Sequence, residues 1–104
     1  MQTHITARHC EVPDDLRTRA AEQMTKLARI ARRPQRAEVI FDIDHQSRIV
    51  ELRLSQPRGK VSVATGEAND FDTALDRAAQ KLRHQLDKPP VPSTRRSTRS
   101  SKAS

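Results

Sequence analysis

NDFDTALDRAAQKLRHQLDK, residues 69–88, carries two rows of side chains at helical spacing and therefore predicts an amphipathic helix. The apolar row consists of Phe71, Leu75, Ala78, Leu82 and Leu86. The basic row consists of Arg77, Lys81, His84 and Lys88. Asn69 or Asp70 can cap the first turn, and Pro89 with Pro90 ends the helix. A basic row is more often a solvated helix face than a binding surface, so the rest of the chain decides its meaning.

The length and charge of the chain fit one small domain with an anionic partner. The 104 residues allow a single domain, which we place at residues 1–88, followed at 89–104 by a basic Ser/Thr/Pro/Arg-rich tail that we expect to be disordered. The net charge is +7, and the tail supplies four basic residues and no acidic one. This balance favours nucleic acid over an acidic protein or a neutral small ligand.

Cysteine content and hydropathy indicate the compartment. The single cysteine, Cys10, excludes an internal disulfide and a cysteine-based zinc site, and it fits a reducing environment. The first residues, MQTHITARH, lack the apolar core of a signal peptide, and no apolar run approaches the length of a membrane span. We therefore expect a soluble, cytoplasmic protein.

A second amphipathic helix is predicted between Pro13, which suits a first helical turn, and Pro34, which stops the helix. Asp14 and Asp15 suit its positive end. Its apolar residues are Leu16, Ala20, Met24, Leu27 and Ala31. At ~100 degrees per residue, a second basic row falls within an arc of about 80 degrees on its far side. This row consists of Arg19, Lys26, Arg29 and Arg33.

Strands are predicted where apolar and polar residues alternate, at residues 2–9, 37–44, 50–55 and 60–67. In the last of these, Val61, Val63 and Thr65 share one face. Polar residues at 45–47 and the QPRG turn at 56–59 connect the last three strands. Short connections of this kind predict an antiparallel meander.

The order strand, helix, three strands, helix predicts an α+β fold in which two helices cover one face of a four-stranded sheet. Each helix has one apolar row and the sheet has one strongly apolar face, so both helices pack side by side on that face. Their basic rows then point away from the sheet. At interhelical distances of roughly 8 to 10 Å, we expect the two rows to merge into one surface with spacing comparable to nucleic acid phosphates.

Four segments in order resemble the short form of the ribosome hibernation promoting factor and ribosome-associated inhibitor family. They are MQTHITARH, EVPDDLRTRAAEQMTKL, the PRG turn and DFDTALDRAAQKLRHQL. The resemblance covers residues 1–88 and implies a four-stranded sheet with two helices on one face, similar to a double-stranded-RNA-binding domain. The second, dimerising domain of the family's long form is not expected here.

The resemblance implies binding to rRNA in the decoding region of the small ribosomal subunit, where the protein inhibits translation by blocking the path of mRNA and tRNA. It implies no enzymatic activity, cofactor, metal, small-molecule substrate or membrane partner, and the free protein is expected to be monomeric. Four residues match rRNA-contacting positions of the family: Lys26, Arg33, Lys81 and Lys88. Helical geometry adds Arg19, Arg29 and Arg77 to the predicted binding residues.

Two positions of the second helix depart from the family's pattern. His84 stands where the family commonly has arginine, and Asp72 stands where it usually has an aromatic residue. Because an imidazole titrates near neutral pH, the contact expected of His84 is weaker or depends on pH.

Other chemistry has weaker support in the sequence. Asp42, Asp44 and His45 could ligate Mg²⁺ or act in acid/base catalysis, but the solvent face of an antiparallel strand has the same pattern. Cys10 follows His9, yet no ordered base and acid can be placed beside them. The alternative function is a general structured-RNA-binding or RNA-chaperone module that uses the same two-helix surface.

Overall fold

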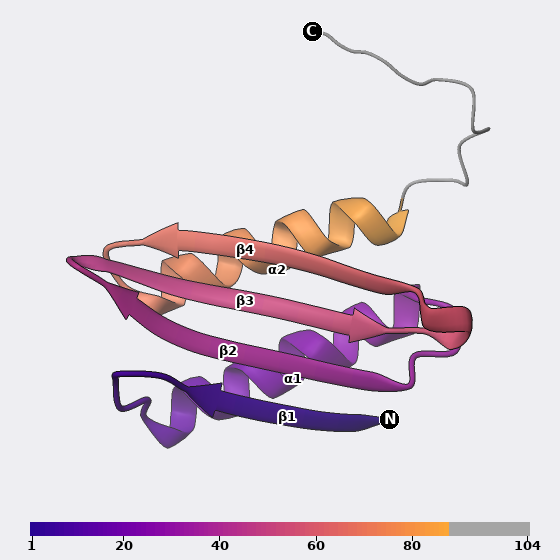
Figure 1. The fold of residues 1–104 in the computed structure, drawn as a ribbon, viewed down its shortest axis with the longest axis horizontal. Coiled ribbons are helices and arrows are strands. Elements are labelled where there is room, and N and C mark those ends of the chain that lie inside the picture. The colour runs from indigo at the N-terminus through magenta and orange to yellow at the C-terminus, as the bar shows by residue number, and fades with distance from the viewer. Residues whose placement is uncertain (88–104) are drawn as a thin grey trace, which may run out of the picture.

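The structure is a computed structural model that describes residues 1–87. Its elements are β1 (Gln2–Ala7), α1 (Asp14–Ile30), β2 (Arg36–Asp44), β3 (Ser47–Ser55), the short 3-10 turn η1 (Pro57–Gly59), β4 (Val61–Ala68) and α2 (Phe71–Asp87). Both helices cover the same face of one sheet, so the molecule has two layers (Figure 1). The predicted α+β fold is therefore confirmed. Lys88 and the predicted tail lie outside the described residues.

The sheet is mixed, with the strand order β1-β2-β3-β4. β1 runs parallel to β2. Parallel neighbours need a long crossover connection, and α1 provides it between these two strands. β2, β3 and β4 pair antiparallel in sequence order, which confirms the predicted meander. α2 packs mainly on β4 and β3, and α1 lies beside α2 over β1 and β2.

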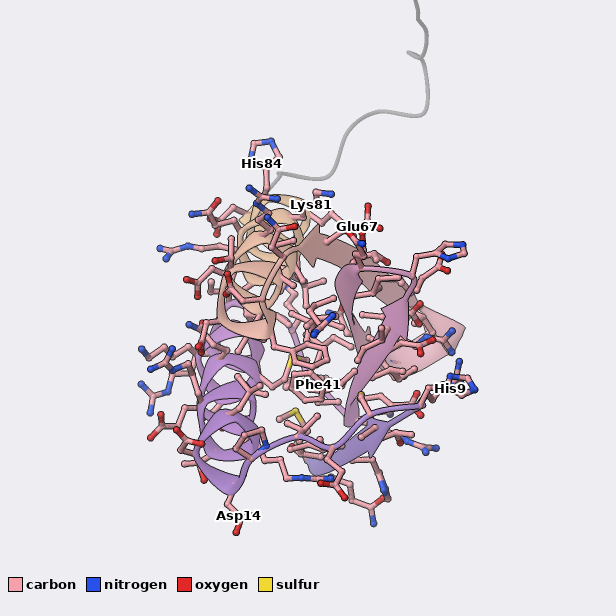
Figure 2. All side chains as sticks on the ribbon, turned by 90° about the vertical axis from the view of Figure 1, so that its left-hand side faces the viewer. His9, Asp14, Phe41, Glu67, Lys81 and His84 are labelled. Atoms are coloured by element: carbon pink, nitrogen blue, oxygen red, sulfur yellow. The ribbon has the colours of Figure 1, made fainter. Side chains whose placement is uncertain are left out.

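The core lies between the sheet and the helices, where the inward residues of β2 and β3 meet the apolar rows of α1 and α2. Phe41 lies at its centre, between the two layers (Figure 2), and its ring packs edge to face against Phe71 with centroids 5.3 Å apart. Leu52, Leu75 and Leu82 are fully buried. Each such side chain contributes roughly 1.5–3 kcal/mol by leaving water.

β4 turns its small residues inward, which the alternation of the sequence does not predict. Val61, Val63 and Thr65 share a face as expected, but it is the outer face, where Val61 and Val63 are 52% and 41% exposed. Gly66 faces α2, and a Cβ atom there would lie 2.5 Å from the Ala78 nitrogen and closer still to the Ala74 carbonyl oxygen. α2 therefore approaches β4 too closely for larger inward side chains.

The helix ends follow the predicted signals with one exception. Asp70 caps α2, because its Oδ1 atom accepts a hydrogen bond from the Thr73 amide at 2.7 Å. Pro13 precedes α1, and Ala31 ends it in an extended conformation. Arg33 therefore lies beyond the helix, with a left-handed φ of 50°. No helix within residues 1–87 has the length and apolar character needed to cross a membrane.

Candidate nucleic-acid interface

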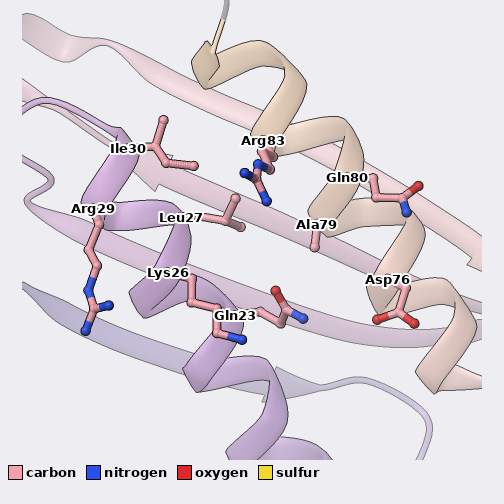
Figure 3. Close-up of a pocket in the computed structure, with 9 residues that line it drawn as sticks. All are labelled: Gln23, Lys26, Leu27, Arg29, Ile30, Asp76, Ala79, Gln80 and Arg83. Atoms are coloured by element: carbon pink, nitrogen blue, oxygen red, sulfur yellow. The ribbon is translucent and has the colours of Figure 1, made fainter.

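Three of the four predicted basic residues of α1 lie on the helix and are exposed: Arg19, Lys26 and Arg29. Arg19 and Lys26 lie on the flank that faces α2. Arg29 borders the groove between the helices, but its side chain points away from α2 (Figure 3). The assignment of Arg33 to this row was wrong, because α1 ends at Ile30 and the chain turns at Arg33. The helical row of α1 is thus shorter than predicted.

Arg19 connects the two helices. Its Nη1 atom lies 2.6 Å from Oδ1 of Asp72 in the first turn of α2. Both side chains are more than half exposed, at 55% and 61%, so water screens the pair and it contributes at most about 1 kcal/mol to stability. The pair nevertheless neutralises one of the predicted RNA-binding charges in the free protein.

An open groove runs between α1 and α2 on the side away from the sheet (Figure 3). Leu27, Ile30 and Ala79 form its apolar floor. Lys26 comes from α1, while Arg83 reaches from α2 into the space between the helices (Figure 3). Asp76 and the amides of Gln23 and Gln80 complete the lining. The groove combines cations from both helices with a single carboxylate.

Arg83 belongs to neither predicted row, and sequence reasoning missed it. It follows Ala79 by four residues, which places both on the flank of α2 that faces α1. Its Nε atom lies 3.6 Å from Oδ2 of Asp87, and its side chain is 69% exposed. The helical spacing from Ala79 was the signal that could have identified it.

The predicted basic row of α2 points toward the outer edge of β4. Arg77 donates from Nη1 to the Glu67 carbonyl oxygen at 2.7 Å, and Lys81 donates from Nζ to that of Thr65 at 3.0 Å. Lys81 and His84 project from the same flank of α2 (Figure 2). Lys88, the last member of the row, lies outside the described residues.

The two basic rows do not merge as expected. Arg19 and Lys26 of the α1 row face α2, whereas the α2 row lies on the opposite flank of α2. A second hollow lies on that opposite flank and is lined by Arg77, Lys81, His84 and Gln85. Gln80 borders both this hollow and the groove, so it marks the crest of α2 between them. The helix layer therefore presents two separate basic strips, one in the groove and one along β4.

A sequence model of the family described as Sigma 54 modulation protein / S30EA ribosomal protein matches residues 3–89. The chain belongs to this family. The chain is also similar to a ribosome hibernation promoting factor of Pseudomonas putida, with 33% identity over 88 residues that cover 85% of each protein. The resemblance to hibernation promoting factors is therefore confirmed.

Solved structures show the same fold as this S30EA family chain. A ribosomal subunit interface protein from Coxiella burnetii superposes with a TM-score of 0.71 and is 25% identical, covering 83% of this chain and 93% of its own. The N-terminal domain of Thermus thermophilus Protein Y superposes with a TM-score of 0.69 at 23% identity, covering 80% and 91% respectively. The shared fold thus extends over about four fifths of this chain.

The acidic residues considered as a metal site, Asp42 and Asp44, each lie next to a different histidine. Asp42 Oδ1 lies 3.2 Å from Nδ1 of His9, and this hydrogen bond, with a second from the Ile43 amide, lowers the pKa of Asp42. His45 lies 3.7 Å from Asp44, at the hairpin. Within residues 1–87, no three His, Cys, Asp or Glu side chains converge on a possible metal position.

Cys10 has the environment of a structural thiol. It is partly buried, and its Sγ atom lies 3.8 Å from the Phe41 carbonyl oxygen. Burial, followed by the charge of Asp42, raises the pKa of the Cys10 thiol. A raised pKa keeps the thiol protonated near neutral pH and opposes reaction as a nucleophile.

Proposed function

We propose that this chain is a ribosome hibernation factor that binds rRNA in the decoding region of the small ribosomal subunit. It inhibits translation there by occupying the path of mRNA and tRNA, and it catalyses no reaction. The observation that carries the proposal is the 33% identity to a ribosome hibernation promoting factor across 85% of both proteins. A ribosomal partner also implies that the protein is located in the cytoplasm and that it binds a polyanion, the rRNA.

The distribution of charge supports the helix layer as the rRNA-binding side. Lys26, Arg29 and Arg83 border the groove, and Arg77 and Lys81 border β4, all with exposed side chains. The outer sheet face instead mixes both signs, as in the pair of Arg53 with Glu51. A phosphate backbone binds most strongly where cations outnumber carboxylates.

The chain has no exposed aromatic platform for unstacked bases within residues 1–87. Its two aromatic residues, Phe41 and Phe71, pack against each other in and beside the core. Arg48 lies over the ring of Phe71, at 5.9 Å from its centroid. Recognition therefore depends on phosphate contacts and on the shape of folded RNA. His84 lies beside Lys81 on the same flank of α2 and joins these proposed contacts.

Sedimentation of the purified protein with small ribosomal subunits in a sucrose gradient tests the proposal. The wild type should co-migrate, and the double variant Lys26→Glu/Lys81→Glu should not, because it places a carboxylate in each basic strip. Arg53→Glu, which reverses a charge on the outer sheet face, should still co-migrate. Circular dichroism spectra should be the same for all three proteins.

Two outcomes would count against this function. Co-migration of the Lys26→Glu/Lys81→Glu variant would remove the helix layer as the rRNA-binding surface. Failure of the wild type to co-migrate at moderate salt, together with binding of free duplex RNA, would support the alternative of a general structured-RNA-binding module. Both functions fit the lack of an exposed aromatic platform within residues 1–87, so the partner that the protein binds distinguishes them.

A further inference from the structure

α2 covers the carbonyl groups of the exposed β4 edge with a ladder of side-chain donors. β4 is the last strand in the sheet, so one of its edges has no strand partner within residues 1–87. Three donors of α2 reach carbonyl oxygens on that edge: Gln85 Nε2 to Val63 at 2.8 Å, Lys81 Nζ to Thr65 at 3.0 Å and Arg77 Nη1 to Glu67 at 2.7 Å. Successive carbonyl groups that face outward are thus occupied.

The ladder is regular because helix and strand repeats nearly match. Four residues along an α-helix rise about 6 Å, and two residues along a strand advance about 6.8 Å. α2 runs back along β4, so each step of four residues in α2 meets a step of two in β4. The resulting spacing of positive and amide groups is comparable to that of successive phosphates in a nucleic acid strand.

The amide groups of the same β4 residues remain available. In an antiparallel pair, a residue that turns its carbonyl group away from the partner strand turns its N–H away as well. Val63 and Thr65 lie opposite Arg53 and Glu51 in this outward-facing register. Outside the ladder of β3 with β4, neither amide donates a hydrogen bond within residues 1–87. The edge therefore offers N–H donors while its carbonyl acceptors are occupied.

We propose that the β4 edge, together with the flank of α2, binds the sugar–phosphate backbone of one RNA strand. Backbone N–H groups, Lys81 and the Gln85 amide all donate hydrogen bonds to this backbone, and His84 borders the hollow that Lys81 and Gln85 line. A further hollow, next to Gln85, is lined by Lys60. Glu67 lies at the other end of β4, and its carboxylate repels phosphate. The phosphates therefore lie toward the Lys60 end of the strand. The identity of the ligand rests on the proposed function.

The same geometry disfavours a protein strand on this edge. Addition of a β-strand requires alternating donors and acceptors along the edge. Here the side chains of α2 occupy the acceptors at Val63, Thr65 and Glu67, so an incoming strand would find donors only. Phosphate oxygens, which accept hydrogen bonds and carry negative charge, match both the donors and the cations.

Amide hydrogen exchange of the free protein tests the geometry. The outward amides of Val63 and Thr65 should exchange much faster than those of Ser62 and Ala64, which pair with β3. Equal protection of all four would overturn the inference. A dimer that protects Val63 and Thr65 without RNA would also overturn it, because the edge would then accept a strand.

Titration with a short single-stranded oligouridine, followed by NMR, tests the ligand. The amide signals of Val63 and Thr65 should shift, while those of Ser62 and Ala64 in the same strand should stay nearly constant. Gln85→Glu should weaken binding roughly tenfold, because the carboxylate repels phosphate and cannot donate to Val63. Gln2→Glu, which adds the same charge in β1 at the opposite edge of the sheet, should weaken it by less than about threefold. Equal losses, or constant Val63 and Thr65 signals, would overturn the site.

These results separate this site from the proposed function. If the wild type co-sediments with small subunits while the Val63 and Thr65 signals stay constant with oligouridine, the β4 site is wrong and the function stands. If those signals shift while the protein does not co-sediment, the site stands and the ribosomal function is wrong.

Discussion

Nη1 of Arg19 lies 2.6 Å from Oδ1 of Asp72, so a residue predicted to bind RNA is held in an ion pair between the two helices. The resemblance identified Asp72 as a position where the family usually has an aromatic residue. A carboxylate at this position competes with phosphate for Arg19. The pair is exposed, so it can open when RNA approaches, but opening lowers the net gain from that contact.

Asp72→Asn should therefore strengthen RNA binding. Release of Arg19 supplies about one more phosphate contact, and we expect affinity to rise roughly fivefold with a salt slope steeper by about 0.7 to 0.9. Fluorescence anisotropy with small-subunit rRNA fragments at several salt concentrations measures both quantities. Asp14→Asn, which removes the same charge at the start of α1, is the control. An equal gain in both variants would show a general charge effect.

Gly66→Ala should be among the most destabilising single changes in the domain. Its new Cβ atom would lie 2.5 Å from the Ala78 nitrogen, in backbone that cannot rotate away, so we expect a loss of about 3 kcal/mol or more. Gly59→Ala is the matched control, because no atom lies within 4 Å of its Cβ position. Its φ of 72° alone should cost about 1 kcal/mol. Urea unfolding followed by circular dichroism compares the two, and equal losses would contradict close packing at Gly66.

The elements could be predicted from the sequence because their periodicity comes from local burial. The helix and strand limits agree with the predictions to within a few residues. The inward face of β4 could not be predicted in the same way, because Ser62, Ala64 and Gly66 are less apolar than Val61 and Val63. Packing distance decides the orientation there, since α2 lies so close to β4 that only small residues fit.

The basic rows show a second limit of sequence reasoning. Helical spacing gives the angle between the apolar and basic rows of α2, but it does not say which flank of α2 faces α1. The structure places Ala79 and Arg83 on that flank, and Lys81 on the other. The right-handed crossover rule for β1, α1 and β2 was the available signal, because it fixes the side on which α1 lies. The separation of the two strips follows from that handedness.

Asp70 predicts a specific pH dependence of stability. Hydrogen bonds from the amide and hydroxyl groups of Thr73 hold the pKa of Asp70 below its ordinary value of 3.8. A carboxylate with a lowered pKa in the folded state stabilises the protein above its unfolded pKa, and this stability is lost as pH falls through the folded pKa. Wild type should therefore exceed Asp70→Asn in urea midpoint at pH 6. The difference should shrink below about pH 4.

Thr73→Val provides the control for this dependence, because it removes the hydroxyl donor and keeps the amide donor. In that background, the loss of urea midpoint caused by Asp70→Asn at pH 6 should be smaller than the loss in the wild-type background. A loss that stays constant between pH 6 and pH 2.5, within roughly the accuracy of the urea midpoint, would show that the carboxylate charge at Asp70 does not contribute.

Arg83 should carry as much of the RNA contact as the predicted residue Lys26, because both border the groove between the helices. Each phosphate contact contributes about 0.7 to 0.9 to the slope of log K against log salt. Arg83→Gln and Lys26→Gln should each lower the slope of rRNA binding by about that amount and weaken affinity across RNA sequences alike. Arg53→Gln removes the same charge from the outer sheet face and should leave the slope constant. If Arg83→Gln behaves like Arg53→Gln, the groove does not contact phosphate, and the α2 contribution comes from the β4 flank alone.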